Sequence, residues 1–123
     1  MELVPSPDGS QLAVTNHEDQ LLIVSVAAGN ARLLDESAFG RPAGPAWSPD
    51  GRWVAYSFPA SPKTSQIKLA EVAGEQVVAV TGPEFKDSCP SFDPTGKYLY
   101  FLSRRSFDPV YDSLFFDLGF PLG

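Results

Sequence analysis

Three segments of the chain share one pattern, and their spacing constrains the fold more than any other feature. Each segment contains a tight turn, Ser-Pro-Asp-Gly or Asp-Pro-Thr-Gly, followed by an apolar stretch. The segments are Val4–Val14, Ala46–Tyr56 and Ser91–Phe101. Their prolines, Pro7, Pro49 and Pro94, lie 42 and 45 residues apart. A period of roughly 40–45 residues is typical of four-stranded β repeats, whereas helical repeats mostly have about 33–34 residues.

Each residue of the repeated turn has a physical role. Proline fixes φ near −65°, aspartate tolerates the next turn position, and glycine supplies the left-handed φ that closes the turn. The serine hydroxyl can form a hydrogen bond with the following backbone. In the third segment Asp93 takes the place of the serine. We therefore expect one turn structure to occur three times.

The apolar stretches after the turns are too short for helices and rich in β-branched and aromatic residues, so we predict strands. Further strands follow in each unit. The predicted strands are 12–14, 21–26 and 31–34 in the first unit, 53–56, 66–72 and 76–80 in the second, and 98–102 and 113–118 in the third. An inner strand precedes each turn. Trp47 and Phe92 fall at the same position of this inner strand, where we expect them to fill the space between units.

The predicted fold class is all-β. We expect a β-propeller fragment of about three four-stranded antiparallel blades, the last lacking its outer strand. The blades are expected at about 2–35, 43–81 and 88–119 within a partial propeller that takes up residues 1–123. Met1 stands directly before an inner strand and the last residue falls inside a blade, so the sequence is expected to be a fragment or the product of a degenerate gene.

The repeat resembles that of known propeller families. Ser-Pro-Asp-Gly followed by an apolar strand is similar to the repeat of TolB-like propellers and of the propellers of the tricorn protease family. The stretches 98–112 and 116–121 resemble the end of the second propeller of a tricorn-type peptidase. That family comprises large cytosolic serine peptidases that trim oligopeptides, with catalytic residues in separate domains. The resemblance therefore implies a non-catalytic segment that acts as scaffold, peptide gate or protein-interaction module.

Two alternatives stay open beside that interpretation. The chain could be a stand-alone TolB-like interaction propeller, or part of an active serine peptidase whose catalytic domains lie outside it. No position of this sequence matches the catalytic motifs of the family. The chain alone is therefore expected not to be an enzyme, although the family that it resembles hydrolyses peptides.

The residues themselves also argue against catalysis or metal binding. The chain has one histidine, His17, and no Gly-x-Ser-x-Gly elbow, so a serine triad cannot be assembled within it. Cys89 precedes Pro90 at the start of an inner strand, where we expect a small buried thiol. The segment His17-Glu18-Asp19 lacks the ligand spacing of zinc or calcium sites. We expect no catalytic residue, cofactor or metal.

One loop is a candidate contact site. The residues Arg104, Arg105, Phe107 and Tyr111 lie in and beside a loop that would sit on one rim of the propeller. Arginine and aromatic side chains are enriched at binding hot spots, so a peptide or another domain could bind here. The alternative is a solvated loop whose arginines pair with Asp108 or Asp112.

Charge and exposed blade faces indicate the partners. The formal net charge of −6 argues against nucleic acid or an anionic membrane surface. The longest apolar run, Leu21–Val24, is too short to cross a bilayer. A single cysteine and no signal peptide indicate a cytoplasmic location. Three blades leave two blade faces uncovered, so we expect self-association, most simply two copies that close a six-bladed ring.

Overall fold

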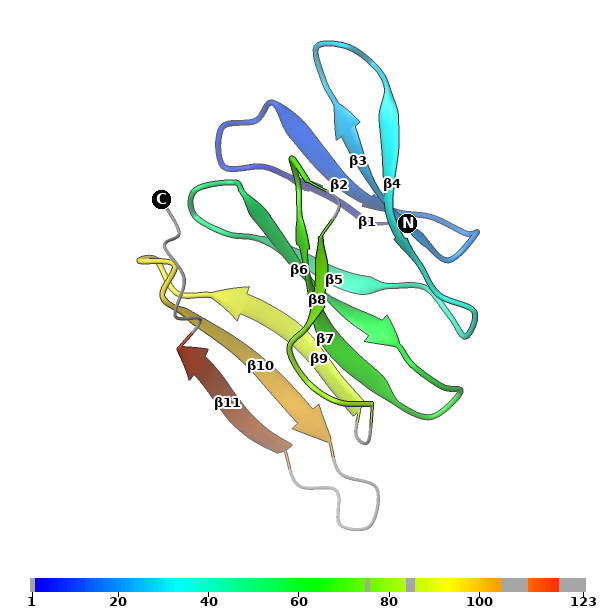
Figure 1. Cartoon of the computed structure of the whole chain (residues 1–123), viewed down its shortest axis with the longest axis vertical. Coiled ribbons are helices and arrows are strands. Elements are labelled where there is room, and N and C mark those ends of the chain that lie inside the picture. The colour runs from blue at the N-terminus through cyan, green and yellow to red at the C-terminus, as the bar shows by residue number, and fades with distance from the viewer. Residues whose placement is uncertain (1, 75, 84–85, 105–110, 118–123) are drawn as a thin grey trace.

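The computed structural model describes residues 2–74, 76–83, 86–104 and 111–117, and within them it consists of strands and turns without a helix. Among these residues, accordingly, no helix is long and apolar enough to cross a membrane. The strands are β1 (Glu2–Pro5), β2 (Gln11–Thr15), β3 (Gln20–Ser25), β4 (Ala31–Glu36), β5 (Ala43–Trp47), β6 (Trp53–Pro59), β7 (Ser65–Glu71), β8 (Val77–Ala79), β9 (Lys86–Phe92), β10 (Tyr98–Arg104) and β11 (Tyr111–Asp117) (Figure 1).

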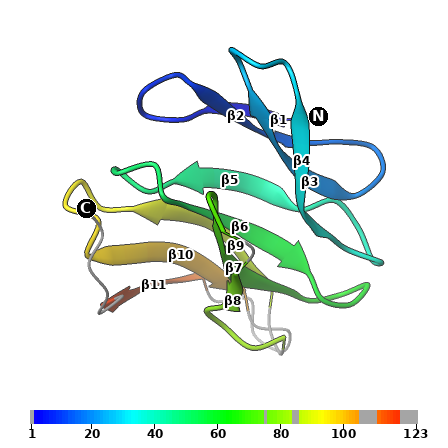
Figure 2. The same cartoon turned by 45° about the horizontal axis from the view of Figure 1, so that its top comes forward.

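The strands form three successive antiparallel meanders, which we name blade 1 (β1–β4), blade 2 (β5–β8) and blade 3 (β9–β11). Blade 1 is a separate sheet with the order β1-β2-β3-β4. Blades 2 and 3 join in one sheet through a single parallel pair, Ser65 of β7 with Lys86 of β9. Figure 2 shows the blades layered in chain order. The predicted all-β propeller fragment is confirmed; the parallel pair was not predicted.

Strand boundaries differ from prediction at the outer strands. β4 runs on to Glu36, because Gln20 pairs with Glu36 across the sheet. β8 ends at Ala79, because the amides of Val80 and Thr81 both donate to the main-chain oxygen of Ile67 and so end the regular ladder. Residues 118–123, where the third blade's outer strand was expected to be missing, lie outside the described residues.

The repeated turn has the same geometry three times. Gly9, Gly51 and Gly96 have φ values of 75°, 74° and 75°, a conformation that favours glycine. In blade 1 the Ser6 hydroxyl accepts a hydrogen bond from the Gln11 amide at 3.1 Å. In blade 3 the Asp93 carboxylate accepts the equivalent bond from the Tyr98 amide at 2.8 Å. The predicted replacement of serine by aspartate therefore keeps the closing hydrogen bond.

Hydrogen bonds also stabilise the charged aspartates of these turns. The amide and hydroxyl of Ser10, followed by the hydroxyl of Ser6, lower the pKa of Asp8 to about 2. Hydrogen bonds from Thr95 and then Tyr98 lower the pKa of Asp93. The aspartates that recur in the sequence thus have the turn function that was predicted for them.

The core lies between the blades, in two buried apolar clusters. Between blades 1 and 2 the buried cluster is Ala13, Leu21, Ile23, Val54, Tyr56, Ala70 and Val72. Between blades 2 and 3 it is Trp53, Ala55, Ile67, Leu69, Leu99 and Phe101. Trp47 packs against the first cluster and Phe92 against the second, as predicted from their shared repeat position.

Two inner strands contain the same β-bulge. In β5, Gly44 and Pro45 lie opposite the single residue Tyr56, and in β9, Cys89 and Pro90 lie opposite Phe101. The first bulge residue has a positive φ in both strands, 61° at Gly44 and 57° at Cys89. Glycine adopts this conformation freely, whereas the Cβ of cysteine makes it costly.

The bulge corrects the prediction for Cys89. We expected a buried thiol, but Cys89 is exposed. The extra residue of the bulge breaks the alternation of the strand, so that Pro90 is buried and the cysteine side chain turns to the surface.

We predict that Cys89→Gly raises the free energy of unfolding by about 0.5–1 kcal/mol, because glycine relieves the strain at this position. Urea unfolding followed by circular dichroism measures the change. The control is Ser91→Gly in the same strand, where φ is not positive and glycine should lower stability. Equal destabilisation by both variants would show that the bulge holds Cys89 without strain.

Candidate functional site

The inner strands β1, β5 and β9 form one surface across the three blades. The Trp47 indole donates a hydrogen bond to the main-chain oxygen of Val4 at 2.9 Å, and the Gly44 amide donates to the Glu2 carboxylate at 3.1 Å. β5 also approaches β9, since a Cβ on Gly44 would lie 3.8 Å from Pro90 Cδ. We name the exposed residues of these strands the inner surface. They are Leu3, Pro5, Ala43, Lys86, Cys89 and Ser91.

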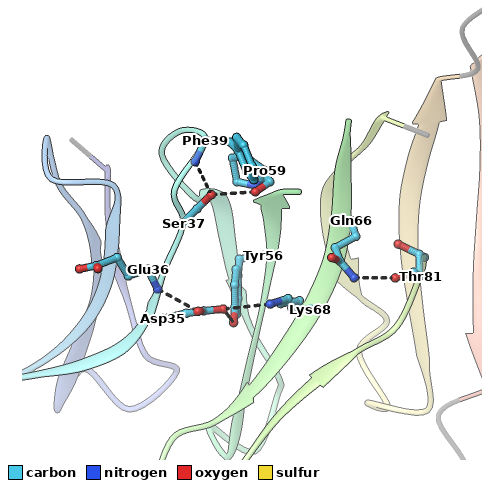
Figure 3. Close-up of polar contacts among 9 residues, drawn as sticks. All are labelled: Asp35, Glu36, Ser37, Phe39, Tyr56, Pro59, Gln66, Lys68 and Thr81. Atoms are coloured by element: carbon cyan, nitrogen blue, oxygen red, sulfur yellow. Dashed lines mark hydrogen bonds and ion pairs between the residues drawn. The ribbon is translucent and has the colours of Figure 1, made fainter. Parts of the chain in front are cut away.

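A polar cluster joins blades 1 and 2 away from that surface (Figure 3). The Tyr56 hydroxyl donates to the Asp35 carboxylate at 2.6 Å, and Lys68 Nζ lies 3.6 Å from the same carboxylate oxygen. The Lys68 ammonium also lies 3.5 Å from the centroid of the Phe58 ring, a cation–π contact. The carboxylate of blade 1 is therefore held by two side chains of blade 2.

Burial, the hydrogen bond to Asp35 and its negative charge together raise the pKa of Tyr56 above its ordinary value. The hydroxyl thus stays protonated and keeps its donor role. Nearby, the Ser37 hydroxyl donates to the main-chain oxygen of Pro59 at 2.7 Å, a second bond between the two blades (Figure 3). This arrangement can fix the angle between the two blades. Its polar groups bond to one another across the junction.

The junction between blades 2 and 3 has a different polar centre, Asp87 at the start of β9. The hydroxyls of Ser57 and Ser65 each donate to its main-chain oxygen at 2.7 Å. Its side chain is buried, with 3% of the residue exposed, and within the described part of the chain the carboxylate oxygen Oδ1 has no hydrogen-bond partner. Ser103, which pairs with Asp87 across β9 and β10, is also buried.

Of the four residues predicted for the rim, the structure describes the backbones of two. Arg104 and Tyr111 form the last pair of the β10–β11 ladder, so their backbones lie opposite each other. Arg105 and Phe107 lie outside the described residues. The contact role of these four residues stays a prediction.

The other titratable residues that the sequence singled out lie apart from one another. His17 is exposed, and its ring nitrogen Nδ1 lies 3.3 Å from Arg41 Nη2. Across the described ranges, no three His, Cys, Asp or Glu side chains gather in a metal-binding arrangement.

Sequence reasoning missed the residues that carry the two junctions. Tyr56 stands 45 residues before Phe101 and 42 after Val14, so a hydroxyl at an otherwise apolar repeat position was a usable signal. Asp87 stands 45 residues after Pro42, which is fully buried in blade 2. Aligning the blades by this offset would have marked a carboxylate at a buried position.

We predict that Tyr56→Phe lowers the free energy of unfolding by about 1–2 kcal/mol, because a hydrogen bond to a charged group at a buried junction is lost. Asp35→Ala and the double variant complete a cycle, which should give a coupling energy of about 1 kcal/mol. Asp35→Asn keeps an acceptor and should cost less than Asp35→Ala. A coupling energy near zero would contradict a direct contribution of this bond.

The sequence and the fold were compared with those of known proteins. The profile described as "Tricorn protease second beta propeller domain" matches residues 1–123. The chain is 43% identical over its full length to "Tricorn protease homolog 1" of Streptomyces coelicolor, of which it covers 12%. It is 42% identical over 115 residues to "Tricorn protease homolog" of Saccharolobus solfataricus, covering 94% of this chain and 11% of that protein.

Solved structures agree with these relatives on the fold. The crystal structure of the tricorn protease matches 93% of this chain with a TM-score of 0.82 at 24% identity, and the match covers 12% of that structure. TolB from Acinetobacter baumannii matches 97% of this chain with a TM-score of 0.76 at 19% identity, over 30% of its own length. The chain thus spans about an eighth of its tricorn relatives. It belongs to the tricorn protease family and corresponds to part of the second β-propeller domain.

Proposed function

We propose that this chain is a non-catalytic propeller segment of a tricorn-like peptidase and acts there as a scaffold and a peptide-gating surface. The match of all 123 residues to the second propeller domain carries the proposal. The chain spans about 12% of its Streptomyces coelicolor relative. We therefore propose peptide hydrolysis for the whole parent protein and not for this segment. A cytoplasmic location, which the family resemblance implies, is included in it.

The inner surface suits an extended peptide. β1 and β5 are each the last strand of their sheet path, so each has an edge outside the strand ladder, where the Val4 oxygen and the Gly44 amide already bond to side chains. Unpaired edges bind extended peptides through main-chain hydrogen bonds, which depend little on peptide sequence. Exposed Ala43 beside the β5 edge adds apolar contact. These features support passage of varied oligopeptides across the three blades.

The single cysteine offers a direct test, because Cys89 is exposed on the inner surface. We predict that a photo-crosslinker attached to Cys89 captures added oligopeptides of about ten residues, measured by mass spectrometry of the product. The matched control carries the crosslinker on Ala27→Cys in a Cys89→Ser background, at an exposed turn away from the inner strands. Equal capture from both positions would contradict a peptide-contacting inner surface.

The same samples test the absence of catalysis. We expect no turnover of fluorogenic peptides by the chain. Turnover that disappears in His17→Ala would overturn the non-catalytic assignment.

We further propose that the isolated chain self-associates through its two uncovered blade faces. Blade 1 presents a row of aliphatic residues on the side away from blade 2. The row is formed by the cross-strand neighbours Leu3, Val14, Leu22 and Leu33, with Leu12 and Val24 beside them. Blade 3 presents Tyr100 and Leu102, which are 40% and 39% exposed.

The repeat explains why the face of blade 3 needs a cover. Leu102 and Tyr100 occupy the repeat positions of Ser57 and Ala55, which are buried against blade 3 in the preceding blade. An apolar face of this kind is normally covered. Two copies that place the blade 3 face of each on the blade 1 face of the other would close a six-bladed ring.

We predict that light scattering gives the isolated chain twice its mass of 13.3 kDa. Leu102→Glu and Leu22→Glu should each shift the population to monomer, because a charge on either face must be desolvated in the ring. Val26→Glu, at an exposed turn position, is the control and should keep the mass of the wild type. A monomeric wild type with a cooperative melt would refute the ring.

A further inference from the structure

Asp87 carries a buried carboxylate oxygen, Oδ1, that has no hydrogen-bond partner among the described residues. Two hydroxyl donors, Ser57 from β6 and Ser65 from β7, hold its main-chain oxygen at 2.7 Å each. The backbone of Asp87 is therefore fixed from two strands of the neighbouring blade. Both of these bonds end at the main-chain oxygen, and no side chain in the described ranges forms a hydrogen bond with the buried oxygen Oδ1.

The blade architecture does not require a carboxylate at this point. The repeat position of Asp87 in blade 2 is Pro42, which is fully buried and carries no side-chain polar atom. The same slot is thus filled by an apolar residue at one junction and by an acid at the next. A buried carboxylate oxygen without a hydrogen bond is costly, so its presence where an apolar side chain suffices points to a ligand.

We propose that Asp87 binds a primary ammonium group at the junction of blades 2 and 3. One unpartnered oxygen suits a single N–H donor, whereas a guanidinium group favours two parallel bonds to both carboxylate oxygens. The serine hydroxyls around Asp87 donate to its main chain and keep lone pairs with which to accept from the other ammonium protons. An ammonium group has three such protons.

The position of Asp87 indicates where the ammonium comes from. Asp87 stands between Lys86 and Cys89, two exposed residues of the inner surface, on the same strand. The N-terminal ammonium of an oligopeptide on that surface is the source that we assign; this assignment rests on the proposed peptide-gating function. The ammonium site itself rests only on Asp87 and its surroundings.

The test is an NMR titration of the 123-residue chain, with the carboxyl carbons of aspartate labelled. The probes are trialanine amide, its N-acetylated form, and n-butylamine. We expect trialanine amide and n-butylamine to shift the Asp87 signal with saturation, and acetylated trialanine amide to leave it unchanged. Asp87→Asn should weaken binding of both amines at least about tenfold, because a charge-assisted hydrogen bond is lost.

The matched control is Asp19→Asn, which changes the net charge equally at a positive-φ position that asparagine tolerates. It should change both affinities less than about twofold. The Asp87 signal of the wild type reports binding directly, so the test holds even if Asp87→Asn does not fold.

The probes separate the two proposals. Equal binding of n-butylamine and trialanine amide supports the ammonium site and removes the N-terminal assignment. Tighter binding of trialanine amide supports both. No shift of the Asp87 signal by either amine, or equal affinity in Asp87→Asn, would overturn the site, whatever the crosslinking experiment shows for peptides on the inner surface.

Discussion

The structure depends on face-to-face packing between successive sheets. A four-stranded blade has two faces, and a small sheet is stable only when its apolar faces are covered. The chain solves this by placing buried apolar side chains on both sides of each junction, such as Leu21 and Tyr56 between blades 1 and 2. This packing, repeated with the turns, sets the spacing of the blades and thereby the position of the inner strands.

The two junctions use that packing with different polar chemistry. Between blades 1 and 2, the Asp35 carboxylate satisfies Tyr56 and Lys68, so the polar groups neutralise one another inside the chain. Between blades 2 and 3, serine hydroxyls hold the main-chain oxygen of Asp87, and one oxygen of its carboxylate has no hydrogen-bond partner in the described part of the chain. A polar network whose groups are all paired makes a junction rigid. A network with an unpaired acceptor can still accept a hydrogen bond from another molecule. The contrast within one small chain separates a structural junction from a candidate binding junction.

The fold was predictable because its signals are local and repeated. The turns that contain Gly9, Gly51 and Gly96 specify conformation within a few residues, and the strands follow from short apolar runs. The parallel pair of Ser65 and Lys86 was not predictable, since it depends on how two blades meet. The exposure of Cys89 was predicted wrongly, because a bulge reverses the alternation of a strand without changing its composition. Asp87 escaped notice for a related reason: its burial comes from the neighbouring blade.

The two tryptophans of the chain stand at different junctions. Trp47 packs on the cluster between blades 1 and 2 and donates its indole hydrogen to Val4, while Trp53 lies in the cluster between blades 2 and 3. Each indole therefore senses the solvent exposure of one junction only. With either one replaced by phenylalanine, intrinsic fluorescence becomes a junction-specific reporter, and the order in which the blades separate during unfolding can be read without any added label.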